Sequence, residues 1–146
     1  MQKNTERQSA RQSNLIDEFF RKRAKQFNLE MVFLFGSRTT FFYRNDSDID
    51  LGVVFDDKAA SDKFIFSKIT DISLQLLKLI NLEINVVPIY PDFRKPLLYY
   101  NIIVLGKPLY IKDYDKYITL RNEAIFHMED FSLFGEKWKM DLAKKN

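Results

Sequence analysis

Apolar residues recur every three or four positions in several stretches, which is the spacing of a helix with one buried face. The pattern predicts helices over residues 9–27, 61–80, 93–105 and 113–142. Ser61 is a suitable N-cap for the second of them, and Gly135 predicts a break in the last. The mostly polar residues 1–8 are expected to be frayed or disordered.

Short apolar runs that end in turn-forming residues predict buried strands between these helices. The runs cover residues 30–35, 48–55 and 82–89, with a small edge strand at 109–111. A short helix is expected at Gly36-Ser37. The alternation predicts an α/β (α+β) fold in which helices flank a small mixed sheet. The length suits a single domain over residues 1–146, with residues 113–146 as a helical C-terminal extension.

Composition adds mainly exclusions to this picture. The chain has no cysteine, which rules out disulfides, thiolate metal sites and thiol nucleophiles and fits a cytoplasmic location. Apolar runs are too short for a membrane span, and the polar N-terminus is unlike a signal peptide. The net charge of +3 is small, although basic residues are denser over residues 3–25. A solvated helix face explains that bias more simply than a nucleic-acid or acidic-partner surface, so nucleic acid is not directly expected as a partner.

Candidate chemistry is concentrated between Gly36 and Asp50. Gly36-Ser37 is followed by ten residues and then by Asp48-Ile49-Asp50. A glycine allows a sharp turn and a close ligand approach, and a helix that begins there directs free N–H groups at a phosphate. Ser37 adds a hydroxyl donor, and Arg38 adds positive charge near the phosphates. Gly36, Ser37 and Arg38 are therefore candidate nucleotide-binding residues, the alternative being an ordinary strand-to-helix turn.

Asp48 and Asp50 are two positions apart on an expected strand, so both carboxylates project from the same face. They repel each other unless a cation lies between them, and hard oxygen ligands suit Mg²⁺ that also binds substrate phosphates. The pair is a candidate catalytic and metal site for one or two Mg²⁺ ions. A polar loop that enters a strand is the alternative, but the spacing from Gly36 favours a site for a nucleoside triphosphate and its metal.

These residues resemble the nucleotidyltransferase superfamily that includes DNA polymerase beta, and more narrowly its minimal members, the MNT proteins. Gly36-Ser37 and Asp48-Ile49-Asp50 match the family pattern of Gly-Ser, ten residues and Asp-x-Asp. A weaker resemblance extends over residues 10–115 and includes the stretch Gly106-Lys107-Pro108-Leu109-Tyr110.

The resemblance implies a mixed sheet flanked by helices and transfer of a nucleoside monophosphate from a triphosphate to a hydroxyl. Many minimal members are antitoxins that add AMP from ATP to a tyrosine of a HEPN-family ribonuclease toxin. The resemblance therefore implies ATP as substrate, Mg²⁺ as cofactor and a HEPN toxin as partner, in a possible hetero-oligomer.

The superfamily usually has a third carboxylate on the next long strand, and the position that matches it here is Asn85. Glu83 lies two residues earlier on the same strand face and is the other candidate for that role. Three alternatives stay open: an active adenylyltransferase, an antitoxin that acts by binding alone, and a transferase that modifies a small-molecule or RNA hydroxyl.

Aromatic residues suggest further contacts. Phe41, Phe42 and Tyr43 lie in the ten-residue spacer, where they can stack on a base or pack over the short helix. Beyond the motif, a toxin-docking or dimer surface is one interpretation of four aromatic residues and core packing is the other: Phe126, Phe131, Phe134 and Trp138.

Overall fold

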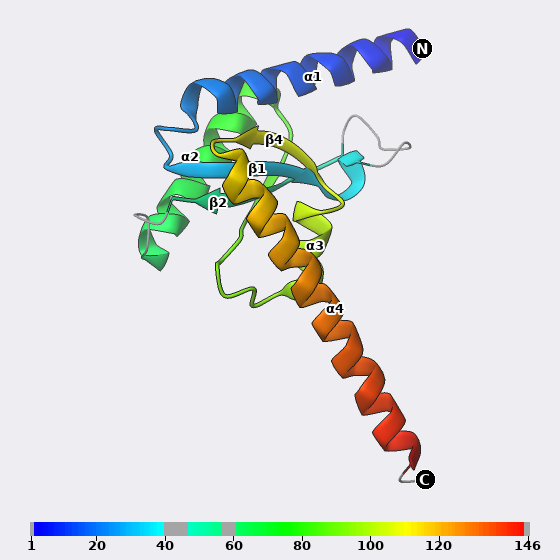
Figure 1. Ribbon diagram of the computed structural model, residues 1–146. Helices are drawn as coiled ribbons and strands as arrows, with labels where there is room; N and C mark the ends of the chain where they lie inside the picture. The colour runs from blue at the N-terminus through cyan, green and yellow to red at the C-terminus, as the bar shows by residue number, and fades with distance from the viewer. Residues whose placement is uncertain (1, 40–46, 57–60, 145–146) are drawn as a thin grey trace.

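A four-stranded mixed sheet forms the centre of the computed structural model, which describes residues 2–39, 47–56 and 61–144 (Figure 1). The strands are β1 (Leu29–Phe35), β2 (Ile49–Phe55), β3 (Ile84–Pro88) and β4 (Lys107–Ile111), in the order β3-β2-β1-β4. β1 is antiparallel to both of its neighbours, whereas β2 and β3 are parallel and are joined by a helical crossover. The predicted fold class, a small mixed sheet flanked by helices, is confirmed.

Helices cover both faces of this sheet. They are α1 (Gln2–Arg23), the 3₁₀ helix η1 (Gly36–Thr39), α2 (Asp62–Ile80), α3 (Pro96–Ile103) and α4 (Tyr114–Lys144). Ser61 caps α2 as predicted, because its side chain accepts a hydrogen bond from the backbone N–H of Phe64 at 3.1 Å. Asn81 ends α2 in the left-handed conformation, at φ 62°.

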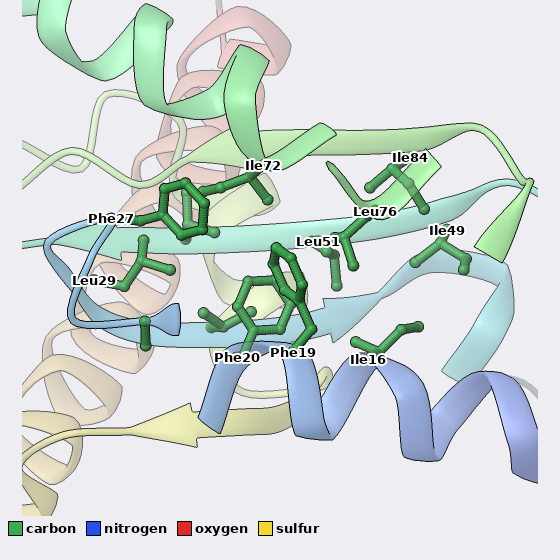
Figure 2. Close-up of a cluster of buried hydrophobic side chains, with 13 residues drawn as sticks. Ile16, Phe19, Phe20, Phe27, Leu29, Ile49, Leu51, Ile72, Leu76 and Ile84 are labelled. Atoms are coloured by element: carbon green, nitrogen blue, oxygen red, sulfur yellow. The ribbon is translucent and has the colours of Figure 1, made fainter. Parts of the chain in front are cut away.

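The two faces of the sheet carry separate apolar clusters. On one face, Phe19 and Phe20 of α1 and Leu76 of α2 pack over Ile49 and Leu51 of β2 (Figure 2). On the other face, α3 and α4 pack over β1 and β2 through residues that include Phe33, Tyr99, Ile102 and Ala124. Alternation along β2 therefore places Asp50, between Ile49 and Leu51, on the face that α3 and α4 partly cover.

Gly52 shows how closely α3 approaches that face. A Cβ at position 52 would overlap the Cγ2 atom of the fully buried Ile102. The glycine at position 52 therefore lets α3 pack directly on β2. This contact lies two residues after Asp50, on the same face of the sheet.

Several predicted boundaries are wrong. α1 begins at Gln2, ahead of the predicted start at residue 9, since an established helix gains one hydrogen bond per added residue. It ends at Arg23 rather than Phe27, and residues 24–28 form a turn in which Asn28 adopts φ 58° directly before β1. α4 continues through Gly135, since one glycine costs a helix only about 1 kcal/mol.

Other boundaries move by a few residues. β3 spans Ile84–Pro88, so it excludes Glu83, and α3 begins at Pro96, a residue well suited to the first helical position. β4 is longer than predicted but is an edge strand as expected. Within the residues that the structure describes, no helix has both the length and the apolar character to cross a bilayer.

Candidate functional site

The Gly36 turn and the Asp50 carboxylate lie against each other. β1 ends at Phe35, which pairs with Asp50 of β2, and Gly36 follows at φ +77°. A Cβ at position 36 would overlap the Asp50 Oδ2 atom. Position 36 therefore requires glycine twice, once for the left-handed backbone and once for the approach of the carboxylate. The Thr39 hydroxyl closes the turn by donating to the Gly36 carbonyl at 2.7 Å.

Asp48 and Asp50 lie on either side of the buried residue Ile49. Ile49 is 1% exposed and points into the α1/α2 cluster (Figure 2), so the Asp50 carboxylate, next along the strand, projects from the opposite face. Asp50 lies in β2 and is half-buried, whereas Asp48 immediately precedes the strand and is exposed. The structure thus places one carboxylate in a fixed position on the sheet and the other at its solvent edge.

Asn85 lies directly beside Asp50. The two residues are register partners in the parallel β2–β3 pair, and the Asn85 Nδ2 atom donates a hydrogen bond to Asp50 Oδ1 at 3.0 Å. One oxygen of Asp50 therefore accepts from Asn85 while the other faces Gly36. The side chain at the position that matches the third carboxylate orients Asp50 rather than adding charge beside it.

Glu83 lies outside β3 and its side chain is exposed. Its backbone carbonyl accepts a hydrogen bond from Ile49 N–H at 2.9 Å, which extends the β2–β3 ladder by one step toward Asp48. The strand register therefore brings Glu83 to the same edge of the sheet as Asp48.

Arg38, a predicted nucleotide-binding residue, donates hydrogen bonds within the protein. Its Nη1 atom donates to Gln12 Oε1 at 2.9 Å, and its Nη2 atom donates to the Ser47 carbonyl at 2.7 Å. Gln12 belongs to α1 and is only 8% exposed. The guanidinium therefore connects α1, the turn after β1 and the residue just before Asp48.

Gln12 is not predicted from the sequence as a residue that supports the site, although its position in the helix is a signal for it. It lies four residues before Ile16 and eight before Phe20, on the stripe that α1 buries. A polar residue on an apolar stripe indicates a buried hydrogen bond, since burial without one is costly. Only the folded chain shows that the partner is Arg38.

The donor set suits a magnesium ion and the phosphates of its substrate. Asp48 and Asp50 supply hard carboxylate oxygens, and Mg²⁺ commonly needs only one or two carboxylates when substrate phosphates complete its coordination. In the described ranges, no group of three His, Cys, Asp or Glu side chains is assembled. This agrees with an amide at position 85 and with a site that a bound nucleotide would complete. Phe41, Phe42 and Tyr43 lie outside the described residues.

Comparison with solved structures shows the same fold in toxin–antitoxin complexes. A chain from an MntA–HpeT mutant complex aligns with a TM-score of 0.66 at 16% identity. A chain from a toxin–antitoxin complex with AMP-PNP aligns with a TM-score of 0.65 at 18% identity. Each of these alignments covers 90% of this chain and 98% of the other. A chain from the complex of tri-AMPylated Shewanella oneidensis HEPN toxin with MNT antitoxin aligns at 0.62 and 16% identity, covering 92% of this chain and 98% of the other.

These identities establish a shared fold, and no curated protein sequence matches the chain significantly. The family model described as "Polymerase beta, Nucleotidyltransferase" matches residues 14–115, which include α1 from Asn14 onward, the Gly36 turn, the carboxylate pair and all four strands. The chain belongs to the polymerase beta nucleotidyltransferase family.

Proposed function

We propose that this protein is an antitoxin-type adenylyltransferase, which transfers AMP from ATP to a tyrosine hydroxyl of a cognate HEPN ribonuclease toxin in the cytoplasm and thereby neutralises it. The observation that carries the proposal is the contact of Asp50 with the Gly36 turn, beside the exposed Asp48, on a nucleotidyltransferase fold. Chains of similar fold come from complexes with AMP-PNP and with a tri-AMPylated HEPN toxin, which supports the choice of nucleotide and acceptor.

In the proposed reaction, the tyrosine oxygen attacks the α-phosphorus of ATP and the bond from that phosphorus to the bridging oxygen breaks. Pyrophosphate leaves with the electron pair. Mg²⁺ held by Asp48 and Asp50 would orient the triphosphate and neutralise charge on the leaving group. Gly36 gives the phosphates access to the backbone, with Ser37 as the proposed hydroxyl donor. Arg38 is proposed as a positioning residue, because it holds the segment before Asp48.

The acceptor hydroxyl must lose a proton, and here the site differs from the usual family pattern. Asn85 cannot act as a carboxylate base, and its amide donates to Asp50. Among the described residues, the exposed Glu83 is a further carboxylate at this edge of the sheet. The Asn85–Asp50 hydrogen bond therefore favours a second candidate function, an antitoxin with weakened catalysis that neutralises its toxin by binding.

The decisive experiment uses α-labelled ATP, Mg²⁺ and the proposed HEPN-family toxin as acceptor. We expect label on the toxin, with losses of at least about 100-fold in Asp48→Ala and Asp50→Ala, since both would hold the metal. Asp71→Ala, an exposed aspartate of α2, serves as the control and should keep full transfer. If the wild type blocks the toxin without labelling it, the binding-only function is correct. Label on RNA or on a small molecule would identify a different acceptor.

The third position can be tested directly by Asn85→Asp. Because a general base contributes about 10²–10⁴-fold, restoring the carboxylate should raise the initial rate of label transfer by about tenfold or more. Asn85→Ala removes the hydrogen bond without adding a base and should lower the rate. Glu83→Gln lowers the rate only if Glu83 accepts the proton. If no variant at these two positions changes the rate, neither residue takes part in transfer.

A further inference from the structure

A pocket of about 410 Å³ lies at the opposite end of β2 from the carboxylate pair. Val54 belongs to its wall, about 13 Å along the strand from Asp50. The floor includes the buried residues Met31 and Ile89, and one side of the rim is the first turns of α4, with the exposed Asp115 and Thr119. This volume falls in the range of sites that bind small molecules, and no residue of the proposed transferase site lines it.

Glu30 is the charged residue at the floor of this pocket, and its side chain is only 7% exposed. The β1–β2 register shifts between Leu29 and Met31, which is the signature of a β-bulge at Glu30. Leu29 packs in the α1/α2 cluster, whereas Met31 packs in the cluster on the other face. The bulge therefore changes the face that β1 presents and places Glu30 on the pocket side.

The Glu30 carboxylate is only half satisfied. Lys116 Nζ lies 3.4 Å from Oε1, at the rim of the pocket, and its side chain is 55% exposed. The second oxygen, Oε2, is buried and has no hydrogen-bond partner among the described residues. A buried carboxylate oxygen without a donor is costly, so a ligand that brings a donor to Oε2 gains an interaction that the protein does not supply.

The charges around the pocket define the ligand further. Among the described residues, three carboxylates line it, those of Glu30, Asp115 and Glu123, together with the ammonium of Lys116. Asp115 and Glu123 are exposed, so solvent screens them and Glu30 carries most of the selectivity. The apolar floor suits an alkyl stem that follows the charged end into the pocket.

We propose that this pocket binds an alkylammonium or alkylguanidinium group, whose charged end donates to Glu30 Oε2 and whose stem lies on the apolar floor. The group comes from a free amine or from a lysine or arginine side chain of a protein. The proposal goes beyond the transferase function and does not depend on it.

The test is an NMR titration of the full chain with n-butylammonium and n-butylguanidinium, with n-butanol as the neutral control. We expect saturable shifts of the Glu30, Met31 and Thr119 amides with the cations. Glu30→Gln should weaken binding by about tenfold or more, because it removes the charge that receives the donor. Glu129→Gln, an exposed glutamate of α4 outside the pocket, is the matched control and should bind as the wild type does.

Lys116→Met provides a second variant in case Glu30→Gln does not fold. It keeps an unbranched stem but removes the ammonium that competes for Glu30, so it should bind the cations several-fold more tightly. Equal binding of n-butanol, unchanged binding in Glu30→Gln, or unchanged binding in a folded Lys116→Met would each overturn the proposal and leave Glu30–Lys116 as a structural ion pair.

Blocked amino acids distinguish the two sources of the cation. N-acetyl-lysine methylamide and N-acetyl-arginine methylamide carry the same groups on a peptide backbone. Binding as tight as that of the butyl cations assigns the pocket to a protein side chain. Exclusion of both, with the butyl cations still bound, assigns it to a free amine. Either result supports a cation site.

Discussion

The candidate transferase site depends on contacts between single residues. Because Gly36 has no side chain, the Asp50 carboxylate can lie against its backbone. Asn85 of β3 donates a hydrogen bond to the same carboxylate. Asp50 is therefore held from two sides, while Asp48 stays exposed at the edge. This asymmetry suits a site in which one carboxylate is preorganised and the other completes its contacts when a ligand arrives.

Gly36→Ala tests this arrangement. The new Cβ would lie in the left-handed region, at φ +77°, and would overlap Asp50 Oδ2. We expect the free energy of unfolding, measured by urea denaturation, to fall by about 1–3 kcal/mol, with label transfer lost through displacement of Asp50.

Gly135→Ala makes the same exchange in the middle of α4, where a helical alanine should instead raise stability by up to about 1 kcal/mol. Equal effects of the two substitutions would contradict the role of Gly36.

At the scale of elements, α1 and α3 each contact the chain near the carboxylate pair, on opposite faces of the sheet. α1 reaches the site through Gln12, Arg38 and the Ser47 carbonyl, so a helix that covers one face of the sheet fixes the segment that leads to Asp48. α3 packs against Gly52 on the other face, and its Tyr99 hydroxyl accepts a hydrogen bond from the Tyr90 backbone N–H at 3.2 Å.

Gln12→Ala should lower the free energy of unfolding by about 1–3 kcal/mol, because hydrogen bonds to charged groups contribute about that much when buried. Urea denaturation measures the change. Gln26→Ala, an exposed glutamine beyond the end of α1, should change stability by less than about 0.5 kcal/mol. A similar loss in both variants would mean that Gln12 does not anchor α1 to the turn.

Tyr99 predicts a pH dependence of stability. Burial raises the pKa of the Tyr99 hydroxyl above its usual value, with the Tyr90 N–H opposing the shift. The unfolded chain therefore loses this proton near pH 10, before the folded chain does, and the Tyr99 contribution to stability falls as pH rises through that window.

Tyr99→Phe removes both the hydrogen bond and the titration. It should lower stability by about 0.5–1.5 kcal/mol at neutral pH, and the difference from the wild type should shrink above about pH 10. Urea denaturation at several pH values measures it. A difference that stays constant with pH would show that the Tyr99 hydroxyl titrates alike in both states.

At the scale of the whole molecule, α4 is the most distinctive feature. It spans 31 residues, and its C-terminal half extends away from the sheet (Figure 1). Of the predicted aromatic surface, Phe126 and Phe131 are exposed, at 64% and 49%, and so is Leu133 at 66%. The side chains of Phe134 and Trp138 lie outside the part of the chain that the structure describes. We propose that these exposed apolar residues of the projecting helix belong to the surface that binds the toxin.

A double variant, Phe126→Asp with Leu133→Asp, tests this surface, since residues seven apart share a helix face. We expect the affinity for the HEPN partner, measured by calorimetry, to fall by about 30-fold or more. Phe66→Asp on α2 is the matched control, because Phe66 is 72% exposed on the opposite side of the sheet. Unchanged affinity in the double variant would assign docking to another surface.

The sequence by itself determined the helices, the strands, the mixed sheet and the Gly36–Asp50 motif, because periodicity, capping and motif spacing are local properties of the chain. It did not determine the contact of Asn85 with Asp50, the exposure of Glu83, the Gln12–Arg38 hydrogen bond or the bulge that turns Glu30 into a pocket. Each of these depends on strand register or on packing between residues far apart in the chain. Only the tertiary structure decides such contacts, since a shift of one residue in register turns every side chain of a strand to the other face.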